Sequence, residues 1–272
     1  MKLSVAQFTE LSVAQFTLVS NIFSFTIAAM GASALFFFLS RSSVAPKYRP
    51  ALMVAGLVVA LATYHYFRIY ESWAQAYALA DGVFKSTAVR FNDAYRYADW
   101  ILTVPLLMVE LIAVLSLPKA QGRSLLIKLV VAAAVMIGLG YPGEISSDTT
   151  TRWFFWAASM VPFVYLLFVL YTQLSSSLKD QPQGVRGLVS LARFVLLVTW
   201  SFYPIAYAII TVTGTKSAIG QVGLQIGYSI ADITSKAGYG LLIYNIARAK
   251  SEAEGYDPDK VDSVTKIATA TA

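Results

Sequence analysis

The sequence predicts an all-α membrane protein, a bundle of seven transmembrane helices with an extracellular N-terminus. Of its 272 residues, 57% are hydrophobic and only 13% are charged. A soluble domain of this length could not bury so much apolar surface, so the bilayer is the expected solvent. The chain also contains seven apolar stretches, each close to the roughly 20 residues that a helix needs to span a bilayer. Proline and glycine recur in the connections, as is typical of turns between helices.

The seven apolar stretches follow one another with mostly short connections. They cover residues 13–40, 50–70, 95–117, 124–141, 152–175, 187–212 and 219–248. The one long connection, residues 71–94, is expected to form an extracellular hairpin. We predict a single transmembrane domain over residues 1–250 and a polar cytoplasmic tail over residues 251–272.

The N-terminal segment does not resemble a cleavable signal, because it lacks a basic region followed by an apolar core and a small-residue cleavage site. It contains a direct repeat, Leu3-Ser-Val-Ala-Gln-Phe-Thr9 followed by Leu11-Ser-Val-Ala-Gln-Phe-Thr17. No similar period recurs later, so this repeat does not indicate a repeat architecture.

Charged residues in the connections predict the orientation in the membrane. The odd-numbered connections and the segment after the last span are rich in lysine and arginine, whereas the even-numbered connections are acidic or nearly neutral. The first group contains Arg41, Lys47, Arg49, Lys119, Arg123, Lys179, Asp180, Arg186, Arg248 and Lys250, and the second contains Glu71, Asp81, Lys85, Arg90, Asp93, Glu144, Asp148 and Lys216. Basic loops stay in the cytoplasm. We therefore expect a multi-pass protein of the cell membrane with a cytoplasmic C-terminus.

Composition excludes several classes of site. The absence of cysteine excludes disulfide scaffolds and cysteine-ligated metals, and a single histidine excludes a histidine-rich metal centre, so no metal site is predicted. The net charge of +6 is modest for a chain of this length. It fits basic cytoplasmic loops better than nucleic-acid binding.

The third span carries two acids on one helix face. Asp99 and Glu110 are eleven residues apart, which at about 100° per residue returns the helix almost to the same direction. They are separated by roughly 16 Å along the axis. Arg96, Thr103 and Leu107 complete the stripe at steps of three or four residues. The stripe favours a proton relay, because ionisable residues within spans usually mark a pathway. The alternative is an Arg96–Asp99 ion pair, with Glu110 reaching toward an interface.

The last span contains Asp232 and Lys236, four residues apart in an apolar helix. A buried lysine is either a structural amine paired with an acid or a covalently used amine, since desolvated amines readily form Schiff bases. Two carboxylates near one lysine would leave net negative charge in the membrane. A protonated Schiff base with Asp99 and Asp232 as counterions and Arg96 beside them accounts for this cluster better.

Three motifs in order resemble the microbial rhodopsins, specifically the proton pumps of the proteorhodopsin and xanthorhodopsin type. They are Arg96-Tyr-Ala-Asp-Trp-Ile-Leu-Thr-Val-Pro-Leu-Leu-Met-Val-Glu110, Trp200-Ser-Phe-Tyr-Pro-Ile-Ala-Tyr207 and Asp232-Ile-Thr-Ser-Lys236. The resemblance covers essentially all seven spans. It implies that the bundle encloses all-trans retinal and that the protein is a light-driven ion transporter and not an enzyme.

Carried over to this chain, the resemblance assigns a role to each intramembrane charge. Lys236 would hold retinal as a Schiff base, with Asp99 as primary counterion and proton acceptor and Asp232 as second counterion. Glu110 would be the cytoplasmic proton donor, neutral in the dark because its surroundings are apolar. Thr103 completes the Asp/Thr/Glu signature of proton pumps.

The resemblance also predicts the retinal pocket. An elongated polyene fits an aromatic slot that restricts which double bond can rotate. The predicted lining comprises Trp100, Leu107, Trp156, Ser159, Trp200, Tyr203, Pro204 and Tyr207, with Met136 and Gly140 near the retinal ring.

His65 is the sole histidine and lies within the second span. Taken alone, it would most simply be a histidine bonded to a neighbouring helix. The resemblance implies instead that it hydrogen-bonds Asp99 and tunes the proton affinity of that carboxylate, a usual role of imidazole near neutral pH.

These assignments predict outward proton pumping. The third and seventh spans run from outside to inside, so Asp99 and Asp232 would lie toward the extracellular side and Glu110 toward the cytoplasm. Isomerisation of all-trans retinal to 13-cis would let the Schiff base pass its proton to Asp99, and Glu110 would then replace it. The resemblance implies that sodium pumps carry Asn, Asp and Gln at the positions of Asp99, Thr103 and Glu110, and that chloride pumps lack the Asp99 carboxylate.

Two readings of other classes remain as alternatives. A photosensory rhodopsin signalling through a partner usually lacks the carboxylate that Glu110 supplies, and a solute transporter would bind no retinal. The resemblance also suggests green absorption from the apolar Leu107, and trimers or pentamers in the bilayer. Trp156 is bulky where pumps with a carotenoid antenna have glycine, so no antenna is expected.

Overall fold

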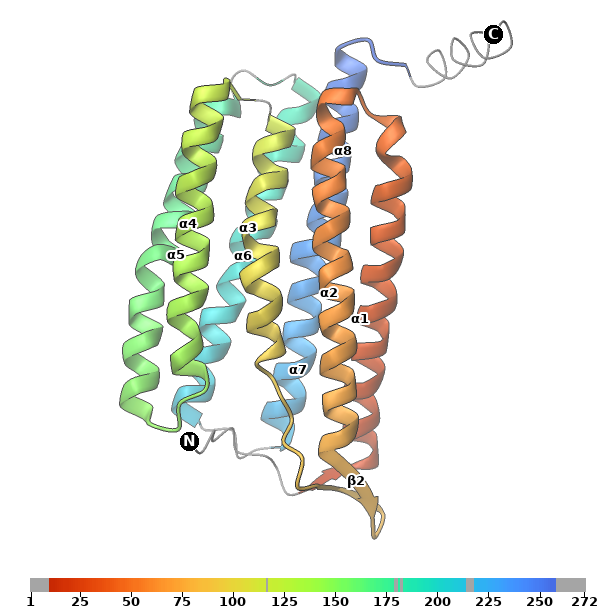
Figure 1. The fold of residues 1–272 in the computed structure, drawn as a ribbon, viewed down its shortest axis with the longest axis vertical. Helices are drawn as coiled ribbons and strands as arrows, with labels where there is room; N and C mark the ends of the chain where they lie inside the picture. The colour runs from red at the N-terminus through yellow and green to blue at the C-terminus, as the bar shows by residue number, and fades with distance from the viewer. Residues whose placement is uncertain (1–9, 116, 179–180, 182, 214–217, 258–272) are drawn as a thin grey trace, which may run out of the picture.

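The computed structural model describes residues 10–115, 117–178, 181, 183–213 and 218–257 of the chain. Its long helices run side by side as one bundle (Figure 1). They are α1 (Val13–Leu39), α2 (Arg49–Ala76), α3 (Tyr95–Leu115), α4 (Lys119–Glu144), α5 (Thr149–Leu178), α6 (Gln183–Thr213), α7 (Ala218–Asp232) and α8 (Tyr239–Ala253). Short 3₁₀ turns η1 (Ser40–Ser43) and η2 (Pro46–Tyr48) connect α1 to α2.

The seventh pass through the bundle consists of three consecutive pieces. Between α7 and α8 lies η3 (Ile233–Gly238), a π-helical turn that contains Lys236. Within the described residues, six helices are long and apolar enough to cross a membrane, and the divided α7–η3–α8 pass is the seventh. The predicted seven-helix bundle is therefore confirmed. α8 continues past the predicted domain boundary at residue 250, and Ser251 is buried within it.

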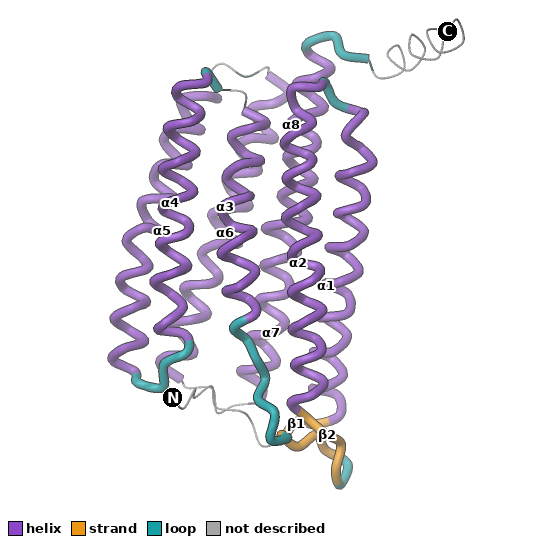
Figure 2. Tube along the Cα trace, viewed as in Figure 1, coloured by secondary structure: helices purple, strands orange, loops and turns teal. Residues whose placement is uncertain are grey.

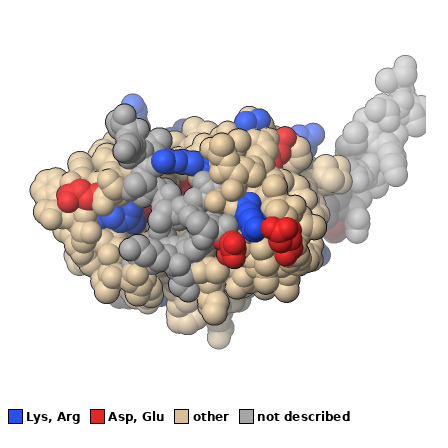
Figure 3. All heavy atoms as spheres, turned by 90° about the horizontal axis from the view of Figure 1, so that it is seen from below, with Lys and Arg blue, Asp and Glu red and all other residues tan. Residues whose placement is uncertain are grey.

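A small sheet lies at one end of the bundle, next to α1 and α2 (Figure 2). Strands β2 (Tyr77–Ala80) and β3 (Val83–Ser86) form the hairpin expected in the long connection, and β1 (Glu10–Ser12) pairs with β3 in the order β1-β3-β2. The hairpin turns at Asp81 and Gly82, whose φ angles are +54° and +80°. Two consecutive positive φ angles and an Asp-Gly pair are typical of a type I′ turn. Figure 3 views this end of the bundle and shows acidic and basic side chains interspersed among uncharged ones.

The second copy of the N-terminal repeat joins this sheet to α1. Leu11 is buried opposite Phe84, and Ser12 forms a capping box with Gln15 at the start of α1. Phe16 stacks on Phe84 with 3.7 Å between ring centroids. The first copy of the repeat lies outside the described residues, as do the predicted loop charges Lys179, Asp180 and Lys216 and most of the predicted tail.

The outer and inner surfaces of the bundle differ in polarity. Large apolar side chains are exposed along the outer faces of the helices, including Leu35, Phe154, Phe168 and Val212. Arg96, Asp99, Asp232 and Lys236, by contrast, are buried inside. Apolar side chains outside and paired charges inside are the arrangement that a bilayer favours.

A buried lysine fastens α8 to α3 at the end of the bundle opposite the sheet. Nζ of Lys250 donates to the carbonyl oxygens of Val114 and Leu115, both at 3.0 Å. These carbonyls belong to the last turn of α3, where no further helical N–H groups are available to them. Lys250 therefore caps a neighbouring helix.

Candidate functional site

Lys236 and two carboxylates form the centre of the buried charge cluster. Nζ of Lys236 lies 2.5 Å from Oδ1 of Asp232 and 3.2 Å from Oδ2 of Asp99. All three side chains are no more than 2% exposed. Asp232 lies next to Lys236 because the two residues are four apart on the same pass through the bundle. Asp99 reaches Lys236 because α3 packs against that pass. π-helical turns occur frequently at functional sites, and η3 carries this lysine.

The Asp232 carboxylate is surrounded by donors. Besides Lys236, it accepts hydrogen bonds from Tyr66 of α2 at 2.8 Å and Tyr203 of α6 at 2.6 Å. The indole N–H of Trp100 on α3 donates at 3.3 Å. Hydrogen bonds to a charged acceptor are stronger than neutral ones. Donors from four elements therefore hold Asp232 as a fixed anion in the cluster.

The Asp99 carboxylate has fewer donors. Its Oδ2 receives a 3.3 Å hydrogen bond from Thr103, and its Oδ1 is buried without a hydrogen bond in the described residues. Nδ1 of His65 is 3.4 Å from that oxygen and also 3.0 Å from the carbonyl of Leu61. Asp99 therefore keeps unused capacity to accept a proton, which Asp232 lacks.

Arg96 pairs with acids other than Asp99. Within the described residues its ion pairs are with Asp93 at 2.8 Å and Asp232 at 3.9 Å. It also donates to Tyr66 at 3.0 Å and Gln225 at 2.6 Å. The alternative of an Arg96–Asp99 ion pair is thus wrong, because Asp93 and the Tyr66–Gln225 pair draw the guanidinium away from Asp99.

Glu110 lies apart from this cluster, toward the far end of α3. It is fully buried, and neither carboxyl oxygen has a hydrogen-bond partner in the described residues. The alternative in which Glu110 reaches an interface does not fit this burial. The structure places Arg96, Asp99, Thr103, Leu107 and Glu110 on one buried face of α3, as the spacing predicts.

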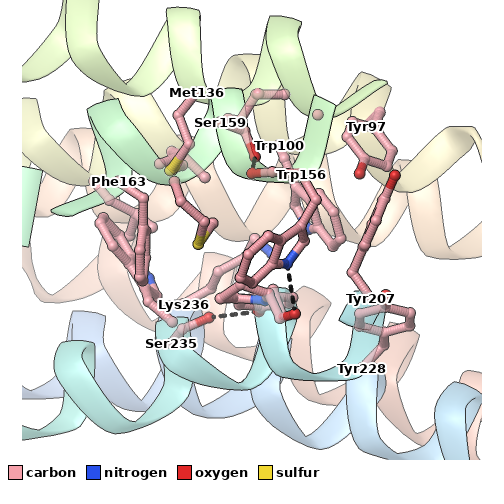
Figure 4. Close-up of a pocket in the computed structure, with 18 residues that line it drawn as sticks. Tyr97, Trp100, Met136, Trp156, Ser159, Phe163, Tyr207, Tyr228, Ser235 and Lys236 are labelled. Atoms are coloured by element: carbon pink, nitrogen blue, oxygen red, sulfur yellow. Dashed lines mark hydrogen bonds between the residues drawn. The ribbon is translucent and has the colours of Figure 1, made fainter. Parts of the chain in front are cut away.

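An apolar cavity adjoins Lys236 (Figure 4). It has about 780 Å³ of empty space, including part that is open to the outside, between side chains of α3, α4, α5, α6, α7 and η3. All ten predicted pocket residues line it, namely Trp100, Leu107, Met136, Gly140, Trp156, Ser159, Trp200, Tyr203, Pro204 and Tyr207. The ring of Trp100 packs at an angle against Tyr203, with 4.9 Å between centroids, and the Trp156 indole donates to the carbonyl of Pro204 at 2.9 Å.

Seven further lining residues were missed from the sequence. They are Tyr97, Val104, Ile137, Met160, Phe163, Tyr228 and Ser235. Most could have been found by helical spacing, since Tyr97 and Val104 lie three and four residues from Trp100, and Met160 and Phe163 continue the face of Trp156. Tyr228 lies one turn before Asp232 on the seventh pass.

The cavity residues fit a covalently held polyene. A mostly aromatic and aliphatic lining with few polar groups is typical of sites for apolar cofactors, and Lys236 is one of the residues that line the cavity. A buried amine beside two carboxylates is suited to carry a positive charge once it is part of a Schiff base.

The fold and this site together define a class, the seven-helix membrane proteins with a buried lysine between two carboxylates and an apolar cavity. The chain belongs to the bacteriorhodopsin-like protein family, whose model matches residues 17–250. The predicted family and the retinal-binding seven-helix bundle are thereby confirmed.

Individual relatives agree with the family assignment. The chain is 29% identical over 245 residues to a green-light absorbing proteorhodopsin of a gamma-proteobacterium, covering 89% of this chain and 90% of the relative. It is 31% identical over 241 residues to bacteriorhodopsin of Halobacterium salinarum, covering 86% of each. The crystal structure of xanthorhodopsin, described as a light-driven ion pump with dual chromophore, matches with a TM-score of 0.88 and 52% identity. That match covers 91% of this chain and 99% of the other.

Proposed function

We propose that this protein is a light-driven outward proton pump that carries all-trans retinal on Lys236. The unequal hydrogen bonding of its two buried carboxylates is the observation that carries the proposal. Asp232 accepts from four side chains, whereas Oδ1 of Asp99 has no hydrogen bond in the described residues. The proteorhodopsin and xanthorhodopsin relatives, the latter described as a light-driven ion pump, support the same function.

Asp99 is the proposed proton acceptor. When bound to Lys236, retinal supplies the light absorption and the isomerisation that reorients the lysine nitrogen. Oδ2 of Asp99 lies 3.2 Å from that nitrogen, within reach of a proton. Asp232 keeps its charge because its donors remain in place, so the proton has one favourable destination.

Glu110 is the proposed proton donor. A fully buried carboxyl without hydrogen-bond partners is far more stable neutral than charged. It therefore stores a proton until the lysine nitrogen has lost its own. Glu110 then refills from the side of the bundle where α3 and α8 end.

The direction of transport follows from the proposed orientation. α3 and the α7–η3–α8 pass run in the same direction, away from the end that carries the sheet (Figure 1). Asp99 lies nearer the sheet and Glu110 nearer the opposite end, because they are eleven residues apart on α3. Because basic loops stay in the cytoplasm, we infer that the sheet lies outside the cell and that each cycle moves one proton outward.

Illumination of an unbuffered suspension of retinal-supplied cells tests this function. We expect the medium to acidify in the light, and a protonophore to abolish the change. The matched variant Asp99→Asn should bind retinal and give no acidification. Absence of a pH change together with a photocycle lasting seconds would favour a photosensory protein, and a colourless protein after retinal addition would favour a solute transporter.

The remaining expectations are part of the same proposal. We propose a multi-pass protein of the cell membrane with a cytoplasmic C-terminus, assembled as a trimer or pentamer. We also propose that it carries no carotenoid antenna, because the indole of Trp156 occupies the side of α5 that faces α6 and bonds to Pro204.

A further inference from the structure

Tyr239 places a hydroxyl group in the apolar interior beyond Lys236. Tyr239 is fully buried, and its hydroxyl has no hydrogen-bond partner in the described residues. Buried tyrosine hydroxyls usually find a partner, and a phenylalanine would fill the same space without the cost of burying an unpaired polar group. The hydroxyl is therefore a feature that packing alone does not explain.

The backbone fixes Tyr239 to the turn that carries Lys236. Its N–H bonds to the carbonyl oxygens of Lys236 and Thr234 at the end of η3. Tyr239 follows Lys236 by three residues, which is about 4.5 Å along a helix axis. Because α3 and α8 run in the same direction (Figure 1), this step goes from Lys236 toward the end of the bundle where Glu110 lies.

Glu110 lies in the same part of the bundle as this hydroxyl. Tyr239 and Leu111, the residue that follows Glu110 on α3, line the same small cavity, and Tyr239 belongs to the same buried cluster as Leu107 and Leu111. Both oxygens of Glu110 and the hydroxyl of Tyr239 are thus buried polar atoms without hydrogen bonds in the described residues, and they lie in one region.

The Tyr239 ring also borders free space. A small cavity lies beside it, lined by leucine side chains of α3, α5 and α6 together with Tyr171 and Arg193. A phenol can donate one hydrogen bond, which is what a newly formed carboxylate needs.

We propose that Tyr239 is a positioning residue for proton return, its hydroxyl donating a hydrogen bond to the Glu110 carboxylate, directly or through one water molecule, when Glu110 releases its proton. This inference rests on the proposed role of Glu110 as donor. The proton leaves the Glu110 carboxyl and arrives on the Lys236 nitrogen, while Tyr239 retains its own proton and shares it with the new anion. Charge-assisted bonds of this kind are strong in an apolar interior, so the hydroxyl speeds the release.

The variant Tyr239→Phe removes the hydroxyl and keeps the ring. Visible absorbance after a laser flash measures the rate of proton return to the Lys236 nitrogen. We expect this rate to be about tenfold lower in the variant, which corresponds to a barrier raised by about 1.4 kcal/mol. Proton transfer to Asp99 should keep its wild-type rate. In time-resolved infrared spectra of the wild type, a tyrosine band should change with the same time constant as the loss of the Glu110 carboxyl band. That tyrosine signal should be absent in Tyr239→Phe.

Two further variants make the outcome decisive. Tyr244→Phe removes a hydroxyl from the same helix, one that pairs with Ser43, and should return the proton within twofold of the wild-type rate. Glu110→Gln tests the donor itself. Slow proton return in Glu110→Gln would support the donor assignment. If Tyr239→Phe then shows a normal rate of proton return and an unchanged tyrosine band, the role of Tyr239 alone is overturned. A normal rate in Glu110→Gln overturns the donor assignment and this inference together.

Discussion

The imidazole of His65 lies against the carboxylate of Asp99, with 3.4 Å between Nδ1 and Oδ1. The same nitrogen lies 3.0 Å from the carbonyl oxygen of Leu61, one turn earlier on α2. A proton on Nδ1 is thus shared between an acceptor on its own helix and an acceptor on α3. The contact with Leu61 orients the ring. The contact with α3 makes His65 a neighbour of the Asp99 oxygen that accepts no hydrogen bond from the described residues.

Replacing His65 by phenylalanine removes a potential hydrogen-bond donor to Oδ1 of Asp99. We expect proton transfer from the Lys236 nitrogen to Asp99 to be about fivefold slower, as for the loss of one hydrogen bond of about 1 kcal/mol. Flash photolysis followed by visible absorbance measures this rate. Tyr64→Phe, an exposed neighbour, is the control and should transfer the proton at the wild-type rate. Identical rates for His65→Phe and the wild type would contradict a role for His65.

The two carboxylates beside Lys236 should respond differently to neutralisation. Asp232→Asn leaves the donors of Tyr66, Tyr203 and Trp100 around an amide and should cost about 3–5 kcal/mol, as for a broken buried ion pair. Asp99→Asn should cost less, because Asp99 makes fewer hydrogen bonds. Thermal unfolding of the retinal-free variants compares them. Equal losses of stability in the two variants would contradict the unequal hydrogen bonding of Asp232 and Asp99.

Lys236 should be the lysine that carries retinal. Borohydride reduction of the illuminated pigment, followed by peptide mass analysis, should place one retinyl group on the Lys236 peptide, because this lysine lines the cavity. Lys250 is also buried but bonds to the carbonyls of α3, so its peptide should stay unmodified and serves as an internal control. A modified Lys250 would refute the assignment.

Lys250 should matter for stability. The variant Lys250→Met leaves the carbonyl oxygens of Val114 and Leu115 without their donor and should lower the free energy of unfolding by about 1–3 kcal/mol. Lys250→Arg retains N–H donors and should lose less. Unfolding in denaturing detergent measures both. A stability of Lys250→Met equal to that of the wild type would show that water replaces the amine without cost.

Asp148 should contribute a pH-dependent cap to α5. The backbone N–H and the hydroxyl of Thr151 both donate to its carboxylate at 2.7 Å, and these hydrogen bonds lower the pKa of Asp148 from its ordinary value of 3.8. A lowered pKa in the folded state means that the contribution is complete above the ordinary value and is lost as the pH falls through the folded value. Asp148→Ala should therefore unfold at a lower temperature than the wild type at pH 7, and the difference should disappear in strong acid.

The matched control for this cap is Asp148→Ser. Serine also accepts from a helix N-terminus but does not ionise in this range. Its unfolding temperature should lie between those of Asp148→Ala and the wild type at pH 7. A pH-independent difference between Asp148→Ala and the wild type would contradict the role of the charge.

The sequence by itself determined the seven spans and the buried stripe on α3, and its resemblance to the microbial rhodopsins predicted most of the cavity lining. Span length and hydropathy reflect the thickness of the bilayer, and helical spacing determines which side chains share a face, so both can be read from the chain. Lys236 and Asp232 were found for the same reason, since their i, i+4 spacing is local.

Only the tertiary structure decided how the charges are partnered. Asp93 and Gln225 draw Arg96 away from Asp99. Donors from four elements meet at Asp232, while Oδ1 of Asp99 accepts no hydrogen bond from the part of the chain that the structure describes. The pairing of Lys250 with α3 and the cavity that Tyr239 shares with Leu111 of α3 are equally invisible in the sequence. Each depends on how far one helix is rotated and shifted against another, and that is set by packing of the whole bundle and not by the spacing of residues along one chain segment.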